Sequence, residues 1–443
     1  MIKQPVKNSL KLASAAGIVF FISHILGINF IVPLTLFSLI AYLKSSSQNS
    51  EFAKCRLLNL ILLFLIIFAA SCYIIRRGLP IFYIPFCLIP MLSTVLFGSL
   101  GVALLLTLAS AFSVSAINGS GLYLAMLFSI SGISVSILVK DARRRIEIIR
   151  AGFITGIVQM AALLFIERFR ISAPDRYLML LGNSIVSSVI VVGILPVFEY
   201  LFKTATNISL LELADFNHPL LQRMILEAPG TYHHSLVVGN LSEAACRAVG
   251  AHALLARIGA YYHDIGKLSK PQYFSENQGL DISKHEALSA GLSKMVIMNH
   301  VKEGLDLAKK YKLNPCLADF ISQHHGNSLV FYFYRRALES LEQDEKIEEE
   351  VFRYPGPKPN TRETAIVLLA DSVEAATRAL KEPSPAKVKE VVHKVINNKF
   401  IDGQLDECDL TLRDLEKIAN IFIHILTGIY HSRVDYAQPT PAS

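Results

Sequence analysis

The sequence of 443 residues is short of charged side chains and of cysteine pairs. Charged residues make up only 18% of it, hydrophobic residues make up 52%, and the mean hydropathy is +0.43. Soluble domains usually carry about 25% charged residues, so this composition excludes a wholly soluble protein. None of the six cysteines forms a CxxC pair, which argues against a zinc finger and a disulfide framework.

The apolar excess lies before about residue 203 and predicts a membrane half followed by a soluble half. A spanning helix needs about 20 mostly apolar residues. The run from Leu12 to Leu43 is too long for a signal peptide and is interpreted as a retained membrane helix. The seven candidate spans are residues 13–43, 56–75, 80–97, 99–117, 121–140, 149–167 and 178–202. The predicted domains are a transmembrane bundle (1–203), a soluble domain (204–436) and a disordered tail (437–443).

A basic cluster between two apolar segments indicates how the chain is oriented. Residues 140–150 contain Lys140 and four arginines, and such loops usually face the cytoplasm. Nucleic-acid binding is the weaker alternative. Two further crossings would return the chain to the same side, so the soluble half is expected in the cytoplasm. Seven spans would put the amino terminus outside, which conflicts with its three lysines, and the exact count is left open.

The soluble half is expected to be helical. Residues 254–262, 295–311 and 363–380 carry apolar side chains at helical spacing. Residues 352–359 cannot form a helix, because proline lacks the backbone donor and fixes φ. The whole chain is therefore predicted to be all-α.

The string His263-Asp264-Ile265-Gly266-Lys267 is the strongest chemical signal in the chain. Imidazole and carboxylate groups bind hard or borderline divalent metals. One carboxylate can bridge two ions, and ions about 3.5–4 Å apart can clamp the attacking and leaving oxygens of a phosphoryl transfer. Gly266 is expected to permit a tight turn. Lys267 is either a phosphate contact or a solvated charge at a helix end.

Further candidate ligands lie at intervals around this string. His300 follows His263 by 37 residues, and the pair His324-His325 comes later. Adjacent side chains on a helix point about 100° apart, so both imidazoles reach one ion only near a helix end, which Gly326 is expected to supply.

The amino-terminal ligand and an aspartate complete the candidate set. His234 precedes His263 by 29 residues and competes with His233 for the first ligand position. Asp371 follows an apolar run, where a carboxylate is costly unless it binds a metal or a cation such as Arg378.

Two other polar residues lie between or beside the candidate ligands in the sequence. Glu374 is expected to pair with Arg378, four residues later. His285 is either a ligand or a substrate contact.

The pattern of His234, His263-Asp264 and Asp371 resembles the HD phosphohydrolase superfamily. Five strings narrow the resemblance to the seven-transmembrane HD family, whose members include cyclic di-AMP phosphodiesterases of the PgpH type: residues 228–235, 262–267, 276–278, 323–326 and 352–359. The resemblance is strong over 205–436 and looser in the membrane half. Typical members carry a first helix and a large extracellular domain ahead of the bundle, and this sequence is expected to resemble them from the bundle onward.

The resemblance implies an all-helical HD domain with two divalent metal ions, often iron or manganese. Asp264 and Lys267 are the implied catalytic residues, and His234 is preferred over His233 because the family's first ligand precedes a serine. The implied ligands are His234, His263, Asp264 and Asp371 for one ion, and Asp264, His300, His324 and His325 for the other.

The implied function is a phosphodiesterase of the cell membrane that hydrolyses cyclic di-AMP to linear pApA, with its HD domain in the cytoplasm. The predicted substrate contacts are Lys267, Tyr232, His285 and Tyr354. Tyr262, Tyr273 and Phe274 are further stacking candidates, although core packing is the simpler interpretation of each. The expected partners are the cyclic dinucleotide and the bilayer, without a nucleic acid polymer, and homo-oligomerisation is left open.

Three rival functions follow from the same residues. The HD domain is either specific for another nucleotide, such as cyclic di-GMP or a guanosine polyphosphate, or is a membrane receptor that binds a nucleotide without cleaving it. The sequence lacks the Gly-Tyr-Pro string typical of cyclic di-GMP-specific HD domains. A transporter ranks last, because the spans contain few of the charges that mark an ion route.

Overall fold

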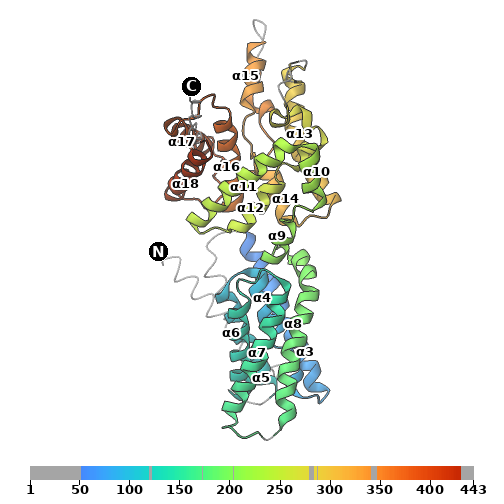
Figure 1. Ribbon diagram of the computed structural model, residues 1–443. Coiled ribbons are helices and arrows are strands. Elements are labelled where there is room, and N and C mark those ends of the chain that lie inside the picture. The colour runs from blue at the N-terminus through green and yellow to red at the C-terminus, as the bar shows by residue number, and fades with distance from the viewer. Residues whose placement is uncertain are drawn as a thin grey trace, which may run out of the picture. The chain divides into compact units, whose positions relative to one another are not determined.

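The computed structural model describes residues 51–430, except 119–121, 172, 203, 279–283, 287 and 341–346. The predicted span 13–43 and the tail 437–443 lie outside the described residues. Within the described residues the only strand-like pairing is an isolated bridge between Leu329 and Arg353, which confirms the all-α prediction. The chain divides into two compact units between Ser209 and Leu210 (Figure 1).

The first unit contains five described helices that are long and apolar enough to cross a membrane. A helix satisfies all of its backbone polar groups internally, which a lipid environment requires. The five correspond to the predicted spans 56–75, 99–117, 121–140, 149–167 and 178–202. They are α3 (Glu51–Arg76), α5 (Leu100–Asn118), α6 (Leu122–Val139), α7 (Arg145–Ile166) and α8 (Pro174–Phe202).

The predicted span 80–97 forms a broken segment instead of one long helix. A short 3-10 turn, η1 (Ile81–Tyr83), precedes the ten-residue helix α4 (Leu88–Phe97), and prolines interrupt the segment because they lack the backbone donor. The Asn183 side chain on α8 donates to the carbonyls of Phe82 (2.6 Å) and Ile84 (2.9 Å). Irregular backbone at membrane depth is tolerated when protein groups satisfy it in this way. The total of seven spans stays a prediction.

After the bundle the chain forms a series of helices of 7 to 21 residues. Several begin where the sequence supplies a cap: the side chains of Ser289, Thr361 and Ser384 accept hydrogen bonds from the first turns of their helices. The helices are α9 (Asn207–Leu213), α10 (Pro219–Glu227), α11 (Pro229–Val249), α12 (Ala253–Tyr262), α13 (Ala290–Lys310), α14 (Pro315–Gln323), α15 (Phe331–Glu339), α16 (Arg362–Arg378), α17 (Pro385–Ile401) and α18 (Leu412–Tyr430).

Short 3-10 turns complete the second unit: η2 (Ile265–Ser269), η3 (Pro271–Tyr273), η4 (Ser275–Asn277) and η5 (Glu349–Phe352). The proline-rich string is non-helical from Arg353 to Asn360, as predicted, although Phe352 closes η5.

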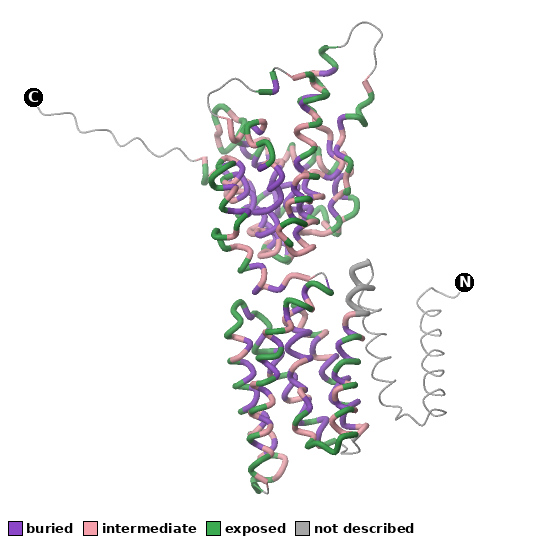
Figure 2. Tube along the Cα trace, turned by 90° about the vertical axis from the view of Figure 1, so that its right-hand side faces the viewer, coloured by how far each residue is buried: buried purple, intermediate pink, exposed green. Residues whose placement is uncertain are grey.

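Helix α16 forms the centre of the second unit. Residues 365–370 are fully buried, because α11, α12, α14, α17 and α18 pack around the helix. Figure 2 shows the corresponding concentration of buried residues in this unit. A helix that is apolar on all sides belongs in a protein interior. The next residue after this run, Asp371, is therefore carried into the interior with it.

Candidate metal centre

The structure brings all seven predicted ligands together, although they come from distant parts of the chain. They form two groups, and within each group the potential ligand atoms lie within 4.8 Å of one another. Helices α11, α12, α13, α14 and α16 or their ends supply the side chains. The first group is His234, His263, Asp264 and Asp371, and the second is Asp264, His300, His324 and His325.

Asp264 belongs to both groups, and its two oxygens face different ones. Oδ2 lies 3.2 Å from His263 Nε2 and 3.6 Å from His234 Nε2. Oδ1 lies 3.4 Å from His300 Nε2 and 3.5 Å from His324 Nε2. The side chain is only 1% exposed. This is the arrangement in which one carboxylate can serve two ions.

Asp371 contacts ligands of both groups. Its Oδ1 lies 3.0 Å from His234 Nε2, and its Oδ2 lies 3.6 Å from His325 Nδ1. Its alternative sequence-based partner, Arg378, instead pairs with Glu374 at 3.4 Å. No lysine or arginine pairs with Asp371 among the described ion pairs, so a buried carboxylate faces imidazoles alone, as a metal ligand does.

Backbone carbonyls orient three of the imidazoles. Nδ1 of His263 donates to the carbonyl of Ala260 (2.6 Å), Nδ1 of His300 to that of Ile297, and Nδ1 of His324 to that of Ile321 (2.9 Å). A carbonyl only accepts, so Nδ1 carries a proton in each ring, and Nε2 is the nitrogen that can bind a metal once the ring is neutral. Outer hydrogen bonds of this kind fix the tautomer and orientation of metal-binding histidines.

A glutamate performs the same task for His234. Glu374 Oε2 accepts a hydrogen bond from His234 Nδ1 at 2.6 Å, while its other oxygen contacts Arg378. The sequence suggested only the pairing with Arg378. Glu374 follows Asp371 by three residues, so one face of α16 carries both groups that contact His234.

The donor atoms fit a pair of divalent ions. His263 Nε2 and Asp264 Oδ1 are buried without a hydrogen-bond partner, although both are strongly polar atoms. Buried polar atoms are nearly always paired, so both are candidates for a ligand bond. The composition, imidazole nitrogen and carboxylate oxygen, suits iron, manganese or zinc.

The protonation states also favour metal binding in the second group. Burial lowers the pKa of His300 to about 4 and holds that of His325 well below its usual value, so both are neutral near pH 7. Burial would also lower the pKa of His263, but Asp264 and Asp371 outweigh it and raise that pKa to about 10. Since a metal binds only neutral imidazole, ion binding at the first group is expected to release protons.

Lys267 lies between two carboxylates. Its Nζ is 2.7 Å from Asp264 Oδ2 and 2.6 Å from Glu276 Oε1, and it lies over the Phe274 ring. Burial would lower the pKa of Lys267, but the two carboxylates outweigh burial and raise it. The side chain therefore stays cationic, which excludes a solvated helix-end charge and a general base. Its predicted contact with phosphate stays a prediction.

Two of the motif strings interlock beside this lysine. Asn277 Oδ1 accepts a hydrogen bond from the Thr231 backbone (3.0 Å), and Thr231 Oγ1 donates to Glu276 Oε1 (3.2 Å). A Cβ on Gly230 would overlap the Glu276 carbonyl. The sequence assigned no role to Glu276, although it lies in one of the five motif strings, and the structure places its carboxylate against Lys267.

Gly266 is required for a reason other than the predicted one. Its φ is not positive, so the turn itself does not demand glycine. A Cβ at this position would overlap the His300 carbonyl and the Gly304 backbone nitrogen on α13. The glycine therefore permits η2 to approach α13 closely. Gly326, by contrast, has φ of +54° just beyond α14, as the helix-end prediction requires.

Burial distinguishes the two histidines that competed for the first position. His234 is 2% exposed and lies in the cluster, whereas His233 is exposed. His285 lies outside both groups of ligands, and its Nε2 bonds to the Tyr273 carbonyl at 2.8 Å. That contact favours a structural or substrate-facing role over ligation.

The predicted aromatic contacts have different environments. Tyr354 stacks on His325 with ring centroids 4.3 Å apart, and Phe274 meets His300 edge to face. Tyr262 is fully buried and donates to the Leu213 carbonyl, so it is a core residue. Tyr232 packs on Phe216, and its predicted role in substrate binding stays a prediction.

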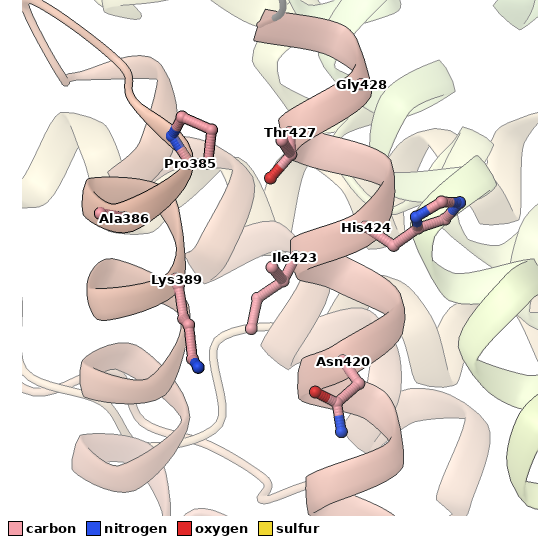
Figure 3. A pocket seen from close by; sticks show the side chains of 8 residues that line it. All are labelled: Pro385, Ala386, Lys389, Asn420, Ile423, His424, Thr427 and Gly428. Atoms are coloured by element: carbon pink, nitrogen blue, oxygen red, sulfur yellow. The ribbon is translucent and has the colours of Figure 1, made fainter.

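An open groove of about 640 Å³ lies elsewhere in the second unit, between α17 and α18 (Figure 3). Pro385, Lys389, Ile423 and His424 are among its lining residues. It contains none of the predicted site residues, and the clustered histidines and aspartates remain the candidate site.

Known proteins with a similar sequence cover both units. Residues 22–206 match the family described as 7TM receptor with intracellular HD hydrolase, and residues 231–376 match the HD domain family. Cyclic-di-AMP phosphodiesterase PgpH of Bacillus subtilis (strain 168) is 44% identical over 323 residues, which are 72% of this chain and 45% of that protein. PgpH of Listeria monocytogenes serotype 1/2a (strain 10403S) is 36% identical over 400 residues, 87% of this chain and 54% of that protein.

The chain spans about half the length of these curated relatives. A crystal structure of the L. monocytogenes PgpH HD domain in complex with cyclic-di-AMP is 44% identical, with a TM-score of 0.47, and covers 49% of this chain and 100% of that chain.

The membrane-length helices and the buried His/Asp clusters define a multi-pass membrane protein with an HD-type domain. The chain belongs to the family of 7TM receptors with an intracellular HD hydrolase, as its motifs predicted.

Proposed function

We propose that this chain is a membrane-anchored, metal-dependent phosphodiesterase that hydrolyses cyclic di-AMP to linear pApA. The observation that carries the proposal is the placement of the two Asp264 oxygens toward two separate groups of imidazoles. Its relatives from B. subtilis and L. monocytogenes, both described as cyclic-di-AMP phosphodiesterases, support the choice of substrate.

The site would hold two divalent ions, iron or manganese. One would bind His234, His263, Asp264 and Asp371, and the other Asp264, His300, His324 and His325. When bound, such a pair of ions activates water as a nucleophile and stabilises the charge of phosphoryl transfer.

The protein's own groups then position the reaction. Water adds to one phosphorus, the bond to the ribose 3′ oxygen breaks, and that oxygen leaves with a proton derived from the water. Lys267 remains protonated beside Asp264 and offers positive charge to the phosphate. Tyr232, His285 and Tyr354 are the proposed contacts to the rest of the substrate.

The HD domain is proposed to lie in the cytoplasm and the bundle in the cell membrane. The basic loop between α6 and α7 is expected on the cytoplasmic side. Helices α7 and α8 are each long and apolar enough to span a membrane, so crossing out and back would return the chain to that side before the soluble unit begins.

A turnover panel tests the proposal. The full chain, purified in lipid nanodiscs and loaded with manganese or iron, is supplied with cyclic di-AMP, cyclic di-GMP or guanosine tetraphosphate, and the products are identified by mass spectrometry. We expect pApA as the main product. Faster turnover of either guanine nucleotide would reassign the substrate, and tight binding of cyclic di-AMP without pApA would identify a receptor.

A further inference from the structure

Lys399 is a lysine near the candidate metal centre, and the sequence assigned no role to it. It lies in the last turn of α17, and its Nζ donates to Ser328 Oγ at 2.7 Å. Ser328 follows the ligand His325 by three residues, and its carbonyl accepts a hydrogen bond from the backbone of Tyr354, which stacks on that ligand. The ammonium group therefore contacts the turn that carries one side of the cluster.

This ammonium has no carboxylate partner within the described part of the chain. The nearby Asp402 carboxylate forms an ion pair with Arg353 (2.8 Å) and accepts a hydrogen bond from Gln404 (2.8 Å). Burial lowers the pKa of Lys399, and Asp371 and Asp402 oppose that effect only from a distance. An ammonium has three donors, and the Ser328 hydroxyl accepts one.

Lys399 differs from Lys267 in its counter-charges. Lys267 has a carboxylate at 2.7 Å and another at 2.6 Å, so the counter-charges of its ammonium come from the protein itself. A partly buried cation without such a partner is costly, unless an anion arrives from outside. Phosphate oxygens form strong, charge-assisted hydrogen bonds with ammonium groups.

Hydrogen bonds between Gln404 and Asn327 fix the end of α17, which carries Lys399, against the turn that follows His325. Gln404 Oε1 accepts a hydrogen bond from the Asn327 backbone at 3.0 Å, and Gln404 Nε2 donates to Asn327 Oδ1 at 2.6 Å. A Cβ on Gly326 would overlap the same glutamine side chain. The end of α17 is thus fixed against the loop, so less conformational freedom is lost when the Lys399 ammonium binds a ligand.

A cyclic dinucleotide presents two phosphates, of which one is cleaved in a turnover. We propose that Lys399 binds the other, uncleaved phosphate of the substrate. The inference rests on the proposed function, and it explains why a cation without a counter-charge lies beside the predicted metal site. Lys399 is then a substrate-binding residue, separate from the groups around Lys267.

The test compares a substrate with two phosphates and one with a single phosphate. The full chain in nanodiscs is assayed with cyclic di-AMP and with bis(4-nitrophenyl) phosphate, which has one phosphodiester. We expect Lys399→Gln to raise KM for cyclic di-AMP about 10- to 100-fold, the loss of one charge-assisted hydrogen bond, with kcat nearly unchanged. Turnover of bis(4-nitrophenyl) phosphate should stay the same.

Two variants complete the design. Lys399→Arg keeps the charge and should recover much of the affinity, whereas Lys394→Gln removes an exposed lysine of the same helix and should change neither substrate. An unchanged KM in Lys399→Gln, or an equal loss of turnover for both substrates, would overturn the inference, the second outcome in favour of a structural role. Failure of the proposed function is seen separately, as absence of pApA from the unaltered protein.

Discussion

Replacing Asp264 with asparagine should weaken both metal positions together. The change keeps the size of the side chain and removes the charge that its two oxygens share between the groups around His263 and His300. Loss of an outer partner of a ligand typically costs 10- to 100-fold in metal affinity. Loss of a direct ligand should lower the affinity for each ion by at least about 100-fold, which is about 2.7 kcal/mol of binding free energy per ion.

Elemental analysis measures this effect directly. The full chain in nanodiscs is loaded with manganese, dialysed against graded chelator, and its metal content per chain is determined. We expect Asp264→Asn to lose both ions at chelator strengths that the unaltered protein withstands. Asp371→Asn should lose chiefly one, because Asp371 belongs to a single group of potential ligands.

A control and a folding measurement make the result interpretable. Asp306→Asn removes an exposed carboxylate of α13 and should leave the metal content unchanged. Because Asp264 also pairs with Lys267, circular dichroism of each variant must first show an intact helical fold. If folded Asp264→Asn kept one ion at full affinity, the shared-carboxylate reasoning would be refuted.

Three further outcomes follow from the same geometry. Glu374→Gln should weaken metal binding by about 10- to 100-fold, since it orients one ligand, and unchanged chelator competition would contradict this. Gly266→Ala should lower the free energy of unfolding by about 1–3 kcal/mol, because its Cβ would overlap α13. Gly291→Ala, which has open space around it, should not destabilise the protein. Equal melting temperatures for the two variants in thermal unfolding would contradict the packing argument. His234→Gln should reduce metal content while His233→Gln, at the exposed neighbour, should not, and a loss in both would mean that burial is the wrong criterion.

Much of the fold follows from local patterns in the sequence. Apolar runs of membrane length predict spans, and five of those predicted match described helices. The segment 80–97 shows the limit of this reasoning, because hydropathy does not register how prolines break a helix or how Asn183, far along the chain, satisfies the exposed carbonyls.

The candidate site was predictable in its residue types and less so in its supporting groups. Imidazoles and carboxylates at scattered positions indicated a metal site, and the family resemblance assigned them to two ions. The sequence did not predict the contacts of Glu276 and Glu374, because each depends on a partner from another helix or turn. When an acidic residue lies at helical spacing from a lysine or arginine, a local ion pair already accounts for it, so the sequence gives no reason to expect a second partner from a distant segment.

The sequence by itself determined that one half of the chain has the hydropathy of lipid-spanning segments and that the other half carries side chains able to bind divalent metals, because hydropathy and donor chemistry are properties of individual residues. Only the tertiary structure decided that His234 faces inward and His233 outward, that the two oxygens of Asp264 serve separate groups, and that Lys399 lacks a counter-charge. These features arise where α11, α13, α14, α16 and α17 pack together, and packing between distant segments is not encoded in any one of them.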